Sequence, residues 1–231
     1  MYHYIEDKEF EQKMRSYCAN IINQLVQRIN NDDFLTVKAQ LIGSGAKKLI
    51  TQNGKEPVDL DYNLYILSFK GRFIPSERDI KEYVRKQFNI VLNKKGWSDC
   101  NDSTSALTTE CRYFVHLKNK TEFSIDLGIV KQDHYGWHRL IHQKTGNIYY
   151  DCYYWNLIPN SHSLAEKAAL IKKAHLWMEV RETYLAKKNM YLKRQDFDHP
   201  SFIVYIETIN EIYNTYLYSK RRLIYGFRSL C

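Results

Sequence analysis

The sequence lacks any apolar run that approaches the roughly 20 residues of a membrane span, and its first residues, MYHYIEDKEFEQ, do not resemble a secretory signal. It has no internal repeat and no low-complexity segment. Its five cysteines form no CxxC pair, which argues against a disulfide framework or a zinc knuckle. They are Cys18, Cys100, Cys111, Cys152 and Cys231. These absences predict a cytoplasmic protein with reduced thiols and no membrane partner.

The composition allows one sizeable core, with or without a helical appendage, because 44% of the 231 residues are hydrophobic. The net charge of +8 favours polyanionic partners such as nucleotides or nucleic acid. The excess is greatest in residues 161–231, which hold 12 Lys and Arg against 7 Asp and Glu. A solvated basic helix face would explain this charge equally well, so charge alone does not identify a partner.

Hydrophobic periodicity predicts an α+β protein with a mixed first part and a helical second part. We expect helices over residues 5–31, 77–94, 163–192 and 200–218, and strands over 34–42, 58–67, 106–117 and 122–131. Ser76 is a suitable N-cap for the second helix. The last two strands are joined by a short polar segment, which suggests an antiparallel hairpin. The pattern changes after Pro159, which predicts one domain over residues 1–160 and another over 161–231.

Three aspartates lie in strand-like runs that are otherwise apolar. In VDLDYNLYIL the apolar side chains alternate, so Asp59 and Asp61 share the opposite face of the strand. In EFSIDLGIV, Asp126 likewise lies opposite an apolar face. If the two strands are neighbours in one sheet, the three carboxylates converge. Such an oxygen-rich group suits Mg²⁺, and two divalent ions about 4 Å apart can activate an attacking oxygen and stabilise a leaving one.

A turn of small residues precedes the aspartate pair. Gly43 and Gly45 let backbone N–H groups approach a phosphate closely, and Ser44 adds a hydroxyl donor. Lys47 or Lys48 can neutralise phosphate charge. Alone, an Asp-x-Asp pair is more often solvated, and a Gly-Ser-Gly segment is mostly just a turn. Their occurrence together, in this order and each after a strand, favours a site for metal ions and a nucleotide phosphate.

The order Gly43-Ser44, Asp59-x-Asp61 and Asp126 resembles that of the DNA polymerase β-type nucleotidyltransferase superfamily, in particular its branch of oligoadenylate synthetases and cyclic dinucleotide synthases. The resemblance implies an α+β fold with a nucleotidyltransferase-like mixed β-sheet, flanking helices and a C-terminal helical region. Carried over to this sequence, the family's catalytic metal ligands are Asp59, Asp61 and Asp126, and its triphosphate-binding residues are Gly43, Ser44 and Lys47. Asp126 would also help to deprotonate the attacking hydroxyl.

The resemblance implies an enzyme that uses Mg²⁺ or Mn²⁺, binds ATP or another NTP, and transfers the nucleotidyl group to an acceptor hydroxyl with release of pyrophosphate. The basic helical part favours an RNA end or a second nucleotide as the acceptor. The alternative is a nucleotide- or RNA-binding module that keeps the fold without turnover. The gap of 16 residues from Gly43 to Asp59 exceeds the family's usual spacing and favours that alternative, whereas the presence of all three carboxylates opposes it.

Two other clusters carry less specific patterns. His134, His138 and His142 are four residues apart, so on a helix they would share a face and could hold Zn²⁺. Gly136 and the nearby aromatic residues disfavour a helix here, so surface positions or base contacts are the favoured roles for these histidines. The aromatic residues between Tyr149 and Trp155 are suited to stacking on a base, but core or interdomain packing is the more common role for such residues.

Overall fold

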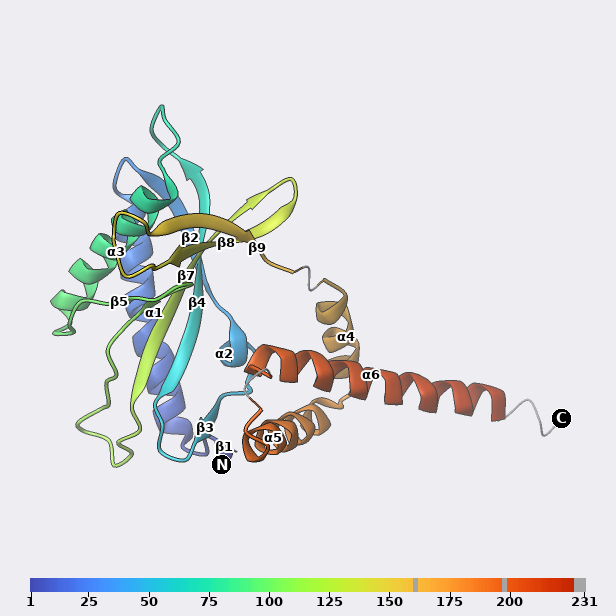
Figure 1. Cartoon of the computed structure of the whole chain (residues 1–231). Coiled ribbons are helices and arrows are strands. Elements are labelled where there is room, and N and C mark those ends of the chain that lie inside the picture. The colour runs from blue at the N-terminus through green and yellow to red at the C-terminus, as the bar shows by residue number, and fades with distance from the viewer. Residues whose placement is uncertain (160–161, 197–198, 227–231) are drawn as a thin grey trace. The chain divides into compact units, whose positions relative to one another are not determined.

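The structure, a computed structural model, describes residues 1–159, 162–196 and 199–226. They form two compact units, one of Ile5–Asn160 and one that combines Met1–Tyr4 with Ser161–Cys231 (Figure 1). The division into domains at residue 160 stays a prediction. No helix in the described ranges is long and apolar enough to cross a membrane. The four cysteines in these ranges are free thiols, and Cys231 lies outside them.

The first unit contains a mixed sheet in which β4 and β7 are central, parallel neighbours. The other strand pairs of this sheet are antiparallel. The order is β2-β4-β7-β6-β5, and β8 pairs with β7 beyond the end of β6 and carries β9 on its other side. The strands are β2 (Leu35–Leu41), β4 (Val58–Phe69), β5 (Asn101–Asp102), β6 (Leu107–Thr108), β7 (Phe123–Asp133), β8 (Gly136–Gln143) and β9 (Cys152–Leu157).

Helices α1 (Lys8–Asn30) and α3 (Glu77–Lys94) contribute to the hydrophobic core of the sheet. Asp7 caps α1 by accepting a hydrogen bond from the Phe10 N–H at 2.9 Å, and Ser76 and Asp79 form a capping box at the start of α3. Alternate residues of β4 and β7 are buried in the same core. The remaining alternate residues, including all three candidate aspartates, therefore lie on the opposite face of the sheet.

The first unit confirms the predicted helix over 77–94 with its N-cap, but the expected strand over 106–117 is wrong. Only Leu107–Thr108 forms a strand, followed by a single bridge between Arg112 and Phe123. The later residues are held by side-chain packing instead of strand pairing, since Phe114 packs on Phe10 and Phe123, whereas Val115 is 78% exposed. The expected loop over 51–57 contains a short strand, β3 (Thr51–Asn53), and the helix after the Gly-Ser turn is α2 (Gly43–Lys47).

The second unit is built from helices α4 (His162–Lys173), α5 (Trp177–Lys193) and α6 (Ser201–Gly226). The single helix expected over 163–192 is wrong, because the chain turns between α4 and α5, where His175 has a left-handed backbone with φ of 61°. Strand β1 (Tyr2–Tyr4) belongs to this unit. Its Tyr2 N–H donates to Asn189 Oδ1 at 2.7 Å, and the Tyr4 hydroxyl donates to the Arg181 carbonyl at 2.7 Å.

Candidate functional site

The structure brings the three predicted carboxylates together on the face of the sheet opposite the hydrophobic core. Strands β4 and β7 are parallel and in register, with Asp61 opposite Asp126 and Asp59 opposite Ser124. Side chains alternate along a strand, so residues two positions apart on one strand share a face, and so do residues that lie opposite each other on neighbouring strands. Asp59, Asp61 and Asp126 therefore form one row that crosses two strands. Asp59 is exposed, whereas Asp61 and Asp126 are partly buried.

Mutual repulsion and burial disfavour the ionised forms of two of these carboxyl groups. Burial first, and then the charges of Asp126 and Asp59, raise the pKa of Asp61 to about 6. Burial and the charge of Asp59 also raise the pKa of Asp126, although a hydrogen bond from Thr108 opposes the shift. A cluster of like charges in a partly buried position is unfavourable by itself and favours binding of a cation.

Two hydroxyl groups orient the carboxylates. Thr108 on β6 donates from Oγ1 to Asp126 Oδ1 at 2.6 Å, and Ser124 on β7 donates to Asp59 Oδ1. Thr108 could not be found from the sequence, because no local pattern shows that it pairs with Asp126 across β6 and β7. These bonds leave Oδ2 of Asp126 and of Asp59 as the oxygens most available to other groups.

The Gly-Ser turn lies directly beside Asp61. The Ile42 N–H donates to the Asp61 carbonyl at 2.8 Å, and Gly43 follows with a left-handed φ of 61°. A Cβ atom at Gly43 would collide with Asp61 Oδ2, so this position needs glycine for both its backbone and its close approach. Ser44 lies in the first turn of α2, and its carbonyl accepts the Leu49 N–H at 3.0 Å.

Lys47 lies at the last turn of α2, near the carboxylates. Its Nζ donates to the Gly43 carbonyl at 3.1 Å, and its positive charge is one of those that lower the pKa of Asp61. Gly43 therefore lies against the carboxylate row, and Ser44 and Lys47 follow it in α2, an arrangement that is compatible with a site for nucleotide phosphates.

Arg139 on β8 is a further charged group of this face that the sequence analysis missed. Its Nη2 donates to Asn63 Oδ1 at 3.2 Å, and its charge lowers the pKa of both Asp61 and Asp126. Gly128 leaves room for it, since a Cβ atom there would lie 3.4 Å from Arg139 Nε. Within the described part of the chain, the buried Nε has no hydrogen-bond partner. An unpaired guanidinium donor beside a carboxylate row is suited to an anionic ligand.

The donor set fits a hard divalent cation. Within residues 1–159, 162–196 and 199–226, no group of three or more His, Cys, Asp or Glu side chains has the arrangement of a ready-made metal site. In the carboxylate row, however, all the potential ligand atoms are oxygens, and the like charges of Asp59 and Asp126 act on Asp61. Oxygen-only ligands suit Mg²⁺ or Mn²⁺ rather than Zn²⁺.

The helix on which the three histidines would share a zinc-binding face does not form, because most of the segment is strand β8, and the surface position expected for these histidines is wrong for the buried His142. His134 precedes β8 and packs on Tyr135 with ring centroids 3.8 Å apart. His142 lies between two carboxylates, those of Asp102 and Asp151. The packing role expected for the aromatic cluster is also wrong for Tyr149, which is 89% exposed.

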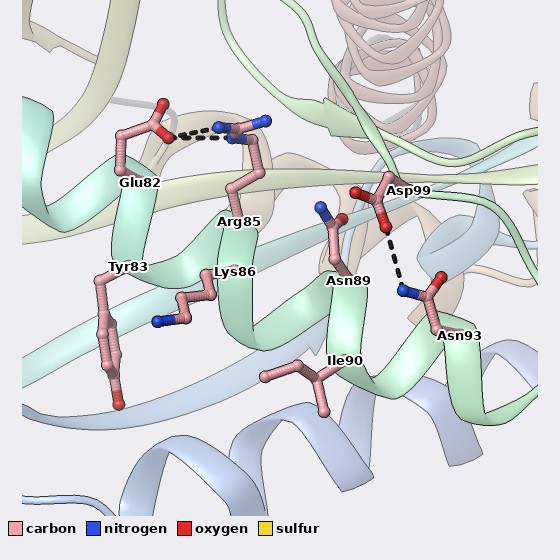
Figure 2. A pocket seen from close by; sticks show the side chains of 8 residues that line it. All are labelled: Glu82, Tyr83, Arg85, Lys86, Asn89, Ile90, Asn93 and Asp99. Atoms are coloured by element: carbon pink, nitrogen blue, oxygen red, sulfur yellow. Dashed lines mark hydrogen bonds and ion pairs between the residues drawn. The ribbon is translucent and has the colours of Figure 1, made fainter.

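A shallow surface pocket along α3 does not include the carboxylate row. Figure 2 shows its lining residues, which are Glu82, Tyr83, Arg85, Lys86, Asn89, Ile90, Asn93 and Asp99. Several of these side chains bind one another. Arg85 pairs with Glu82 at 2.5 Å, and Asn93 donates to Asp99 at 3.1 Å. The row of carboxylates, with the Gly-Ser turn and Arg139, is therefore the stronger candidate site.

No protein-family model matches the sequence, and no curated protein is similar to it at a significant level. Solved structures are similar in fold. The cyclic AMP-GMP synthase DncV of Vibrio cholerae, solved with the linear intermediate pppA(3′,5′)pG, has a TM-score of 0.57 at 9% identity, over 90% of this chain and 68% of that one. CdnC of E. coli MS115-1, solved with ATP, has a TM-score of 0.53 at 18% identity, over 88% of this chain and 61% of that one.

A second DncV structure, with nonhydrolyzable GTP, has a TM-score of 0.53 at 9% identity. The match covers 78% of this chain and 62% of that one, so this chain spans less than two thirds of the length of this DncV structure and of CdnC. The predicted α+β class and mixed sheet are confirmed. The chain therefore shares the fold of DncV and CdnC, a nucleotidyltransferase-like α+β fold.

Proposed function

We propose that this protein is a Mg²⁺-dependent nucleotidyltransferase that transfers NMP from an NTP to an acceptor hydroxyl and releases pyrophosphate. One observation carries the proposal. Asp61 and Asp126 lie opposite each other on parallel strands, Asp59 shares their face, and the Gly43 turn packs directly against Asp61. The nucleotidyltransferase fold supports the same activity. The conversion breaks the bond between the α- and β-phosphates and forms a bond from the acceptor oxygen to the α-phosphorus.

Asp59, Asp61 and Asp126 would hold Mg²⁺, or Mn²⁺ in its place. When bound, the metal supplies positive charge beside the phosphates and favours loss of the acceptor proton. The chain's own residues bind and orient the substrates. Because Thr108 occupies Oδ1 of Asp126, Oδ2 is the oxygen that would accept the acceptor proton. The raised pKa of this carboxyl group is suited to that role.

The triphosphate would lie against the Gly43 turn. The absence of a side chain at Gly43 lets the backbone approach a phosphate, and Ser44 offers a hydroxyl donor. Lys47 and Arg139 would neutralise part of the negative charge of the triphosphate, since both positive charges act electrostatically on Asp61. These donors would also stabilise the pyrophosphate that leaves.

A nucleotide or an RNA end is the acceptor that we favour. The net charge of +8 suits a polyanionic acceptor. The solved DncV complex contains a linear dinucleotide intermediate, and that of CdnC contains ATP, which supports a nucleotide acceptor for a chain with the same fold. The alternative is a nucleotide- or RNA-binding module without turnover, and the long segment between Gly43 and Asp59, with β3 inside it, favours that alternative.

The test is incubation of the protein with each of four radiolabelled NTPs and Mg²⁺, with and without RNA. We expect labelled polymer or a new nucleotide product, together with pyrophosphate. The doubly substituted Asp59→Ala/Asp61→Ala protein should form neither. If the protein binds NTP equally well without metal and in this variant, and releases no pyrophosphate, the binding module replaces the enzyme.

Replacement of Arg139 should lower the catalytic efficiency with which the protein uses the NTP. We expect Arg139→Met to lower kcat/KM for the NTP by roughly ten- to a hundredfold, which is the usual value of one or two charged hydrogen bonds. Steady-state kinetics of pyrophosphate release measure the effect. Lys131→Met is the matched control, because Lys131 lies on the neighbouring strand β7 and its Nζ lies over the Trp155 ring at 4.4 Å. Equal losses in the two variants would contradict a specific role for Arg139.

The raised pKa of Asp61 predicts opposite effects of pH on metal binding and on stability. Because protons compete with Mg²⁺ for Asp61, the apparent Mg²⁺ affinity should fall by up to about tenfold for each pH unit below a pH of about 6. The folded state binds this proton more tightly than the unfolded chain. Metal-free stability should therefore rise as pH falls from about 6 toward the ordinary value of 3.8.

Mg²⁺ titrations of activity, and thermal unfolding in the presence of a chelator, measure these two effects over the same pH range. Asp61→Asn is the control for the stability effect, because it removes the titrating group. A Mg²⁺ requirement that stays constant across this range would contradict the role of Asp61 as a metal ligand.

A further inference from the structure

Thr108, the residue that orients Asp126, lies on a short hairpin at the end of the sheet. Strands β5 and β6 have two residues each, and the turn between them is closed by the Ser103 N–H, which donates to the Ala106 carbonyl at 2.9 Å. Thr108 at the end of this hairpin donates to Asp126 Oδ1 at 2.6 Å. Strand β6 pairs with β7 at only two positions, and a two-stranded hairpin adds little stability of its own, so further contacts are needed to fix the turn.

Lys81 on α3 supplies two of those contacts from the core side. It is 1% exposed, although lysine is almost never fully buried without a partner. Its Nζ lies 2.6 Å from Asp102 Oδ1 and donates to the Ser103 carbonyl at 2.8 Å. The buried ammonium group therefore holds both the side chain at the end of β5 and the backbone of the turn that follows.

His142 on β8 holds the same turn from another element. Its Nδ1 lies 2.6 Å from Asp102 Oδ2, its Nε2 lies 3.0 Å from Asp151 Oδ2, and its backbone N–H donates to the Thr104 carbonyl at 2.8 Å. With a carboxylate at each ring nitrogen, the imidazolium form donates to both. The Tyr153 ring stacks on the imidazole with centroids 4.0 Å apart, which fixes the plane of the ring.

The contacts form a small buried cluster of Lys81, Asp102, His142 and Asp151, which we call the hairpin anchor. It contains two acidic and two basic side chains, so its charges balance when His142 is protonated. Side-chain exposures are low, at 2% for Lys81, 12% for Asp102, 6% for His142 and 10% for Asp151. Charged groups buried to this extent hold fixed positions, because leaving any one of them unpaired is costly.

A hydroxyl chain connects the anchored turn to the carboxylate row. Ser103 Oγ lies 3.2 Å from Thr108 Oγ1. The Thr108 hydroxyl has one hydrogen, which it donates to Asp126, so it accepts the hydrogen from Ser103. The direction of the chain is then Ser103 to Thr108 to Asp126. It starts at the residue whose carbonyl Lys81 binds.

We infer that the hairpin anchor is a positioning device for the proposed active site. It fixes the β5–β6 turn, the turn fixes Thr108, and Thr108 selects the orientation in which Asp126 presents Oδ2. The inference rests on the proposed function, because it gives Asp126 a role in nucleotidyl transfer. Hydrogen-bond partners just outside a metal-binding set typically change activity by roughly ten- to a hundredfold when they are removed.

The decisive test is a double-mutant cycle of Asp102→Asn and Thr108→Val. Each variant should lower kcat by roughly tenfold or more, with KM for the NTP changed less than about twofold, because the triphosphate contacts lie elsewhere. Since Asp102 acts through Thr108, the double variant should lose no more activity than Thr108→Val alone. Losses that multiply, or an unchanged kcat per folded molecule in Asp102→Asn, would overturn the inference.

Two further variants keep the test valid if Asp102→Asn folds poorly. Ser103 is exposed, so Ser103→Ala should fold normally and lower kcat by about fivefold, the value of one hydrogen bond. Gln87→Met is the matched control, because Gln87 is a buried polar residue of the same helix as Lys81 but binds Arg28 instead of the hairpin. It should lower the thermal midpoint while kcat stays unchanged.

Hydrogen exchange separates failure of this inference from failure of the proposed function. Amides of residues 101–109 should exchange faster in Asp102→Asn than in the original protein, and Gln87→Met should leave them unchanged. If the original protein transfers no nucleotide, the proposed function fails and exchange still tests the anchor. Equal exchange of this segment in all three proteins would show that the cluster does not hold the hairpin.

Discussion

Asp126→Asn should lose at least about a thousandfold in kcat while it keeps the fold, because it removes both a metal ligand and the proposed proton acceptor. Asparagine has the shape of aspartate, and its Oδ1 can still accept the Thr108 hydrogen bond. The substitution also removes a negative charge that raises the pKa of Asp61. The thermal midpoint of the metal-free protein should therefore stay the same or rise.

Measurement of kcat together with thermal unfolding distinguishes this outcome from simple loss of structure, which would lower both. The matched control is Asp133→Asn on the same strand. Asp133 is exposed, binds the Tyr135 N–H at 2.9 Å, and lies beyond the carboxylate row, so its replacement should leave kcat unchanged. Retention of more than about a tenth of the activity by Asp126→Asn would contradict its assigned role.

Gly43→Ala should have the second-largest effect, with a loss of roughly a hundredfold or more in kcat/KM for the NTP, the scale seen when a catalytic group is misplaced by about an ångström. The new Cβ would collide with Asp61 Oδ2, so the carboxylate or the turn has to move. The left-handed backbone at φ of 61° adds about 1–2 kcal/mol of strain for a residue with a side chain. Steady-state kinetics measure the loss of activity caused by the collision, and denaturant unfolding measures the loss of stability caused by the backbone strain.

Gly54→Ala separates the strain from the collision. Gly54 has nearly the same left-handed φ, 56°, but a Cβ atom there meets no atom within 4 Å. Both variants should therefore lose similar stability from the backbone, whereas only Gly43→Ala should lose activity. If Gly54→Ala is equally inactive, the effect of Gly43 arises from strain in the segment and not from its approach to Asp61.

Much of this fold follows from local patterns. The helix over 77–94 was predictable because its start has both a capping serine and an apolar period of three to four residues. Strand β4 was predictable because its alternation leaves one face fully apolar. The strand expected over 106–117 failed because apolar composition alone does not show whether a partner strand is available, and most of that segment has none in the described structure.

The sequence by itself determined the chemistry that the chain carries: three aspartates opposite apolar strand faces, and a Gly-Ser turn before the first pair. These features depend on residue type and on periodicities of two and 3.6, which a short window of sequence contains. The aspartates and the turn indicate the proposed metal ligands, and the hydrophobic periodicities indicate the α+β class. The sequence also showed a glycine at position 43, but it did not show the close approach to Asp61 that requires a glycine there.

Only the tertiary structure decided which groups surround those aspartates. Thr108 reaches Asp126 because β6 pairs with β7, and Arg139 reaches the same face because β8 pairs farther along β7. The hairpin anchor joins α3, β5, β8 and the segment before β9, whose residues are up to 70 positions apart. Pairing of distant segments is selected by the burial of the whole core rather than by any local pattern, so no single stretch of the sequence contains it.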